Sequence, residues 1–182
     1  GHDGLMDEAS GEPDVGDQLA LTAESITLRP FRLEDVAAYV DQQDHLLAAG
    51  FGWERPIDEV SMRAVAERWV RQWNGPRDER NFAILERSSG VLVGDCELEL
   101  RTDGFVHVMY GIFRPWRGKG YASRAVGLLL GYRSLVWPST PVLFRIHADN
   151  EPSIAIARGA GAIPDGAEAS PQGRELRRWV LT

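Results

Sequence analysis

Apolar and polar residues follow two different periods along this chain, and each period predicts a different element. Alternation with a period of two is typical of a strand with one buried face, and a period near 3.6 is typical of a helix with an apolar stripe. Strands are predicted at 25–29, 81–86, 91–100, 106–113 and 174–181, together with a short, largely apolar strand at 141–147. The turns at 87–90 and 103–104 contain glycine and favour hairpins.

Helical spacing is found in the remaining segments. A first helix is predicted at 33–40, and a second at 58–73, where Asp58 suits an N-cap and Asn74-Gly75-Pro76 ends the element. Further helices are predicted at 119–136 and from about Pro152 to Gly159. The segment 44–56 is interpreted as a helix end followed by a loop. Trp69 and Trp73 are expected to pack in the core.

The N-terminal stretch differs in composition from the rest. Residues 1–22 are polar, acidic and rich in Gly and Asp, which predicts a disordered tail. Gly1-His2 resembles the remnant of a cleaved tag. Residues 23–182 then form a single mixed α/β domain.

Composition narrows the function classes. No apolar run is long enough to span a membrane, so we expect a soluble, cytoplasmic protein. The single cysteine, Cys96, is interpreted as a buried thiol, and no metal site is expected. The net charge of −7 argues against a nucleic-acid partner; it suits a cationic substrate or serves solubility alone.

The stretch 106–122 combines a strand, a glycine-rich turn and a helix start. Its turn contains Gly118 and Gly120, and the unpaired N–H groups of a helix's first turn bind anions such as phosphate. A nucleoside-triphosphate loop would need Ser or Thr after Gly118-Lys119, where this chain has Gly120, and the features of a dinucleotide fingerprint are not evident. Taken alone, the glycines could also serve only a tight turn.

The motif Arg-x-x-Gly-x-Ala at Arg117, Gly120 and Ala122 resembles the acetyl-CoA signature of the GNAT superfamily of N-acyltransferases. The Asn-x-x-Ser at Asn150 and Ser153 resembles the second motif of that family. The order of elements from Ile26 onward also fits, and the most similar subgroup is the one that contains the RimJ/RimL-like ribosomal-protein N-terminal acetyltransferases. The resemblance implies a mixed, mostly antiparallel sheet, splayed between 106–113 and 141–147 and flanked by helices.

The resemblance also implies acetyl-CoA as co-substrate. Backbone groups of Ile112, Phe113 and Arg114 would pair with the pantetheine arm. Asn150 would bind near that arm, and Ser153 would lie close to the sulfur. The backbone N–H groups that would hold the pyrophosphate are those of Arg117, Gly118, Lys119, Gly120, Tyr121 and Ala122.

Direct acetyl transfer needs an amine that has lost its proton and a thiolate that gains one. Ala157 occupies the place of a tyrosine found in other members, so Ser153 or a water would protonate the thiolate. His107 occupies the place of a frequent glutamate and is the candidate general base, although it could equally be a half-buried strand residue. Glu97 and Glu99 are the alternatives, acting through water, and each taken singly is typical of a solvated strand face.

The acceptor wall is expected from the first two helices and the loop between them. Its candidates are Asp44, His45, Phe51 and Trp53, with Glu97 on the sheet, and aromatic groups beside an acid would suit a cationic amine. These residues could also serve packing.

We therefore expect a direct N-acetyltransferase, acting as a monomer or homodimer on a protein N-terminus or on an amine-bearing small molecule such as an antibiotic. The alternatives are a non-catalytic acyl-CoA-binding sensor or scaffold, and a nucleotide-binding protein.

Overall fold

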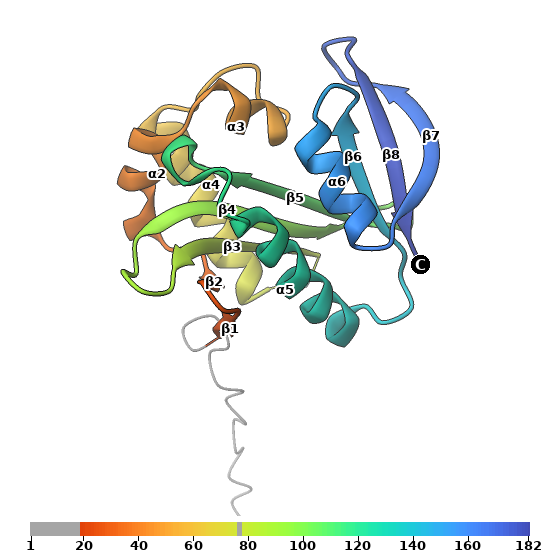
Figure 1. The fold of residues 1–182 in the computed structure, drawn as a ribbon. Coiled ribbons are helices and arrows are strands. Elements are labelled where there is room, and N and C mark those ends of the chain that lie inside the picture. The colour runs from red at the N-terminus through yellow and green to blue at the C-terminus, as the bar shows by residue number, and fades with distance from the viewer. Residues whose placement is uncertain (1–18, 76–77) are drawn as a thin grey trace, which may run out of the picture.

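The computed structural model describes residues 19–75 and 78–182, and these form one twisted sheet with helices on both faces (Figure 1). The strands lie in the order β1-β2-β3-β4-β5-β6-β8-β7. All neighbouring pairs are antiparallel except β5 and β6. The strand bounds are β1 Leu21–Thr22, β2 Ile26–Pro30, β3 Glu79–Glu86, β4 Leu92–Leu100, β5 Val106–Ile112, β6 Val142–His147, β7 Ile163–Ala169 and β8 Glu175–Leu181.

Five α-helices and two short 3-10 turns complete the described part of the chain. The bounds are η1 Leu33–Asp35, α2 Val36–Gln42, α3 His45–Gly50, α4 Glu59–Trp73, η2 Arg114–Trp116, α5 Tyr121–Val136 and α6 Glu151–Gly159. None of the helices in residues 19–75 and 78–182 is both long and apolar enough to cross a membrane.

The sheet separates two apolar clusters. One face packs on α5 and α6 through residues such as Val126, Leu129 and Ile154. The opposite face, over β2 to β4, packs on α2, α3 and α4, with Tyr39, Leu47 and Trp69 in its core. Because side chains alternate along a strand, each strand contributes one set of residues to each face.

Most of the predicted helices and strands are confirmed, and Cys96, Trp69 and Trp73 are buried as expected. Two of the predicted elements need correction. The helix expected from Lys119 begins at Tyr121, because the backbone is left-handed at Gly120. Residues 45–50 form a helix of their own, with Asp44 as its N-cap, where a helix end and loop were expected. Strand β7 was not predicted at all.

The predicted tail lies outside the described residues except for its last four. Of these, Leu21 and Thr22 form β1 and pair with Leu28 and Thr27 of β2.

Candidate active site

A glycine loop between β5 and α5 forms an anion cradle. Gly118 and Gly120 have φ values of 77° and 80°, a left-handed conformation that glycine adopts without steric cost. In the described part of the chain, the backbone N–H groups of residues 118–123 donate no hydrogen bond, and they lie at the positive end of α5. The Arg117 N–H, which was expected among the free groups, instead donates to the Arg114 carbonyl at 3.3 Å. The Arg117 side chain anchors the loop by donating from Nε to the Ile112 carbonyl at 2.8 Å. This geometry fits a pyrophosphate.

Two further loop residues make side-chain contacts. The Lys119 Nζ lies 4.9 Å from the Trp116 ring centroid, and the Tyr121 hydroxyl donates to Glu86 Oε2 at 2.6 Å. The roles predicted for Lys119, Tyr121 and Ala122 concern their backbone N–H groups, which these contacts leave free.

The sheet opens beside this loop. Strands β5 and β6 pair only at Val106 with Val142 and at His107 with Leu143, although β5 continues to Ile112. Beyond these pairs the two strands diverge, and the unpaired edge of β5 faces the opening. We call this opening the split. An extended ligand such as a pantetheine arm could pair with that edge as a neighbouring strand would.

The backbone groups that face the split differ in part from those expected. The Phe113 N–H already donates to the Val93 carbonyl at 2.8 Å, and the Ile112 carbonyl accepts from Arg117. The Val106 N–H points toward β6, and the direction of the backbone groups alternates from one residue to the next along a strand. The backbone groups of Val108 and Tyr110 and the N–H of Ile112 therefore also point toward β6. Tyr110 was therefore missed by the sequence analysis, although the alternation from Val106 contains the signal.

Across the split lies the N-terminus of α6. Asn150 caps this helix, with its Oδ1 accepting from the Ser153 N–H at 3.2 Å. The cap leaves the amide NH₂ of Asn150 without a protein partner in the described residues. The Tyr110 hydroxyl reaches over the split and donates to the Ser153 carbonyl at 3.4 Å. Two hydroxyl groups, those of Ser153 and Tyr110, are thus near the place where the resemblance puts the sulfur.

The candidate acceptor wall lies on the opposite face of β5. A Cβ placed on Gly111 would meet Leu47 Cδ1 at 2.6 Å and Phe51 Cε2 at 3.5 Å, so glycine allows α3 to approach the strand. Phe51 and Trp53 stack with ring centroids 5.5 Å apart. Both rings are half-buried, and Trp53 also packs on the core beneath α2.

Asp44 links this wall to the glycine loop. Its two carboxylate oxygens accept from Arg117 Nη2 and Nη1 at 2.8 and 2.7 Å, and Oδ1 also accepts from the Leu47 N–H. The Arg117 hydrogen bonds, with help from the backbone, hold the pKa of Asp44 below its ordinary value. Both oxygens are engaged, so Asp44 fixes the position of α3 relative to the loop, and its role toward a substrate stays a prediction.

The acidic face of β4 is buried where a solvated face was expected. Asp95 is 0% and Glu97 is 4% exposed, because α2, α3 and α4 cover this side of the sheet. Asn81 Nδ2 donates to Asp95 Oδ2 at 3.1 Å and to Glu97 Oε2 at 3.2 Å. Burial raises the pKa of Asp95 to about 7 and that of Glu97 to about 8. Asp95 was missed as a candidate because its burial depends on helices distant in sequence.

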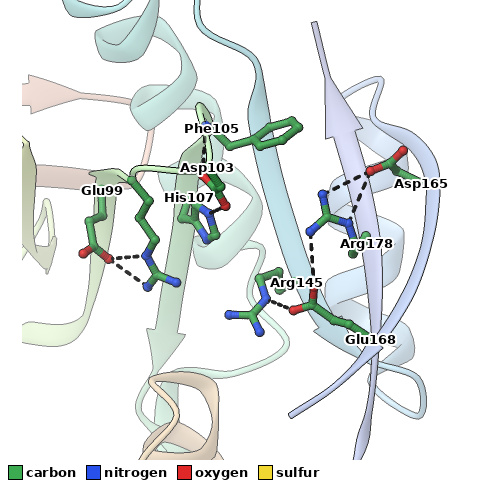
Figure 2. A network of polar contacts seen from close by, with 9 residues as sticks. Glu99, Asp103, Phe105, His107, Arg145, Asp165, Glu168 and Arg178 are labelled. Atoms are coloured by element: carbon green, nitrogen blue, oxygen red, sulfur yellow. Dashed lines mark hydrogen bonds and ion pairs between the residues drawn. The ribbon is translucent and has the colours of Figure 1, made fainter. Parts of the chain in front are cut away.

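His107 lies at the closed end of the split, on the same face as Glu97 and opposite α5. Its ring Nε2 is 2.7 Å from Asp103 Oδ2 (Figure 2). Burial lowers the pKa of His107, Arg101 and Arg145 lower it further, and the Asp103 carboxylate opposes these effects. A neutral imidazole that donates from Nε2 to Asp103 keeps a lone pair on Nδ1, which can accept a proton.

The predicted residues therefore divide between the two faces of the sheet. His107, Glu97, Phe51, Trp53 and Asp44 belong to the face of α2, α3 and α4. Asn150 and Ser153 belong to the side of α6, and the split connects the two sides. A proton acceptor and a proton donor could thus act on opposite sides of one thioester.

Comparison with known proteins identifies the class. A family model described as an acetyltransferase (GNAT) domain matches residues 25–163, and the chain belongs to this family. The SPbeta prophage-derived uncharacterized N-acetyltransferase YokL of Bacillus subtilis (strain 168) is 26% identical over 165 residues, which are 88% of this chain and 84% of that protein. The protein is accordingly a GNAT acyltransferase, and acetyl-CoA is the acyl donor of this fold.

Solved structures show the same fold. The ribosomal-protein-S5-alanine acetyltransferase from Vibrio fischeri superposes with a TM-score of 0.74 at 13% identity, covering 90% of this chain and 96% of that one. The ribosomal L7/L12 alpha-N-protein acetyltransferase RimL in complex with coenzyme A gives a TM-score of 0.73 at 13% identity, covering 90% and 97%.

Proposed function

We propose that this protein transfers an acetyl group directly from acetyl-CoA to a primary amine, either a protein N-terminus or an amine on a small molecule such as an antibiotic. The observation that carries the proposal is the split between β5 and β6, which opens beside the left-handed glycine loop. The ribosomal-protein acetyltransferases among the structural relatives support a protein N-terminus as one acceptor class. Acetyl-CoA, when bound, supplies an activated acyl group on a good leaving thiolate.

The chain's own residues would bind and orient this co-substrate. The free N–H groups of residues 118–123 would hold the pyrophosphate, and the Arg117 side chain keeps the loop in place. The edge of β5 at Val108, Tyr110 and the Ile112 N–H would pair with the pantetheine arm, and the Asn150 amide would donate to it from α6. This leaves the thioester near Tyr110, between the two faces of the sheet.

On the acceptor face, His107 would remove the proton from the amine. Its lowered pKa keeps the imidazole neutral at pH 7, and Asp103 holds the ring by its Nε2. Glu97 is the alternative, with Glu99 beside it. With its pKa raised to about 8, Glu97 would accept a proton readily only when ionised, which favours alkaline conditions.

On the opposite side, a hydroxyl would protonate the departing thiolate. Ser153 and Tyr110 are both close to the α6 N-terminus, and burial raises the pKa of Tyr110, so that its hydroxyl stays protonated. Cys96 is fully buried in the core beneath α5, and burial raises the pKa of its thiol. It therefore does not serve as a nucleophile, which supports direct transfer without an acyl-enzyme.

One observation favours a second candidate function, a module that binds acyl-CoA without turnover. The two best-placed bases are both buried, with His107 5% and Glu97 4% exposed, and each already has a polar partner. A sensor or scaffold would need the glycine loop and the split but no free base.

A thiol-release assay with acetyl-CoA and a panel of amines separates these possibilities. We expect free thiol with at least one amine, and a loss of about 10²-fold or more in kcat for His107→Gln, with coenzyme A affinity unchanged. Glu99→Gln tests the remaining alternative base, since Glu99 faces His107 across the β4–β5 pair, and Glu59→Gln at an exposed position of α4 is the control. Full activity in His107→Gln together with its loss in Glu97→Gln would transfer the role of base to Glu97. Tight coenzyme A binding without thiol release from any amine would favour the binding module.

A further inference from the structure

A charged pocket of about 260 Å³ lies next to the closed end of the split, on the face opposite α5 and α6. Its lining combines the β4–β5 turn with β5, β6, β7 and β8 (Figure 2). The charged or titratable side chains are Arg101, Asp103, His107, Arg145, Glu168 and Arg178. Of these, only His107 and Asp103 are used by the chemistry described above.

The carboxylates of this pocket already have partners. Glu168 accepts from Arg145 Nε and, through Oε2, from Arg178 Nη1 at 3.2 Å. Asp103 accepts from the Phe105 N–H at 3.0 Å and lies against His107. These acids therefore have little capacity left to bind a cation.

Two of the three arginines, by contrast, keep unused donors. Arg145 is engaged through Nε only, and among the described residues its two terminal nitrogens have no partner. Arg101 uses Nε and Nη2 on Glu99, which leaves Nη1. Arg178 is fully committed, since its remaining nitrogens donate to Asp165 Oδ2. Glu99 and Asp165 offset the charges of Arg101 and Arg178, so among these arginines only Arg145 keeps both terminal nitrogens for a ligand.

The position of Arg145 relates this pocket to the acetyl-transfer site. Leu143 makes the last pair with β5, and Arg145 follows two residues later, about 7 Å along β6. Its neighbours Phe144 and Ile146 belong to the core beneath α5 and α6, so the Arg145 side chain points to the acceptor face. Figure 2 shows its guanidinium between Glu168 and the strand that carries His107.

We propose that this pocket binds a carboxylate of the acceptor, so that the preferred acceptors are amines bearing a carboxylate within a few bonds of the amino group. The proposal rests on the proposed acetyl transfer and specifies its acceptor. The terminal nitrogens of one guanidinium match the two oxygens of a carboxylate, and the nearby Asp103 and Glu168 carboxylates repel a phosphate dianion more strongly than a monoanion. The same chemistry can come from a free amino acid or from an acidic residue near a peptide N-terminus.

Binding measurements test the pocket separately from catalysis. The probes are glycine, β-alanine and γ-aminobutyrate, each against its amide, and N-terminal seryl-aspartyl against seryl-asparaginyl peptides with amidated C-termini. We expect at least one carboxylate to bind about tenfold or more tighter than its amide in the wild type, which corresponds to about 1.4 kcal/mol. The amino acid and peptide pairs decide which source of the carboxylate is used.

Arg145→Gln should abolish this preference, while Glu168 keeps Arg178 as a partner and the fold is retained. Arg177→Gln is the matched control, because Arg177 lies next in sequence to Arg178, is about half exposed and pairs with Glu175 outside the pocket. A bound carboxylate should also raise the pKa of His107, measured from its ring proton signals, because it offsets the charges of Arg101 and Arg145. Thermal unfolding checks that each variant is folded.

A wild type without any carboxylate preference, or a preference that survives in a folded Arg145→Gln variant, overturns the inference. The outcomes separate it from acetyl transfer. Equal thiol release with amides and carboxylates would support the acetyltransferase and contradict the carboxylate site. Carboxylate binding that depends on Arg145, without thiol release, would support the carboxylate site and contradict the acetyl transfer.

Discussion

Replacing Gly118 by alanine isolates the contribution of the left-handed loop to coenzyme A binding. Gly118 has φ of 77°, and a Cβ at this position would meet no heavy atom within 4 Å. The substitution therefore adds backbone strain and no steric clash. For a residue with a Cβ, this conformation costs about 1–2 kcal/mol.

The same strain can be introduced away from the site. Gly173, in the turn between β7 and β8, also has φ of 77° and open space around its Cβ position. Gly173→Ala should lose this strain energy in stability, a decrease in melting temperature of about 2–8 °C for a chain of this size. Gly118→Ala should lose less, because its loop can turn in the free protein.

Only Gly118→Ala should weaken ligand binding. If the free protein relieves the strain by turning the loop, coenzyme A must restore the left-handed form, and its affinity falls by about 5- to 30-fold. Isothermal titration calorimetry of both variants with coenzyme A measures the difference. Equal affinities in Gly118→Ala and Gly173→Ala would refute the assignment of the pyrophosphate to this loop.

Three further predictions concern the rest of the site. Burial raises the folded-state pKa of Asp95 to about 7, so between about pH 4 and 7 the unfolded chain releases this proton first and stability falls as pH rises. Asp95→Asn should make this slope shallower by up to about 1.4 kcal/mol per pH unit in urea unfolding, and an unchanged slope would contradict the burial argument. In a double-mutant cycle on coenzyme A affinity, Asp44→Asn and Arg117→Gln should couple by about 1 kcal/mol, because the pair is bidentate but partly exposed; additive effects would show that it does not support the loop. Tyr110→Phe should lower kcat by about 10²-fold with coenzyme A affinity unchanged if this hydroxyl protonates the thiolate; an unchanged kcat would leave Ser153 or water as the donor.

The sequence predicted the parts of this fold that depend on local residues. Strand alternation placed β3, β4 and β5 closely, and the paired glycines placed the turn before α5, because only glycine adopts φ near 80° without cost. Strand β7 escaped prediction since it is largely exposed and contains Pro164 and Gly166, so no apolar alternation marks it.

Features of the site that depend on distant segments were predicted less well. The polar face of β4 looks solvated from its own residues, and only the packing of α2, α3 and α4 shows that Asp95 and Glu97 are buried. The contact of Tyr110 joins β5 to α6, and the pocket around Arg145 joins the β4–β5 turn to β5, β6, β7 and β8. No local pattern specifies either of them. The residues of the glycine loop could be identified from the sequence, but the ion pair between Arg117 and Asp44 could not.

Direct acetyl transfer is the central claim, and mass spectrometry of a complete reaction tests it most directly. The protein is incubated with acetyl-CoA alone and with acetyl-CoA plus each amine of the panel, and the molecular masses of both protein and amine are measured. We predict an acetylated amine, free thiol in equal amount, and no acetyl group on the protein under either condition. An acetylated protein intermediate, or an amine panel left wholly unmodified while coenzyme A binds tightly, would contradict the account.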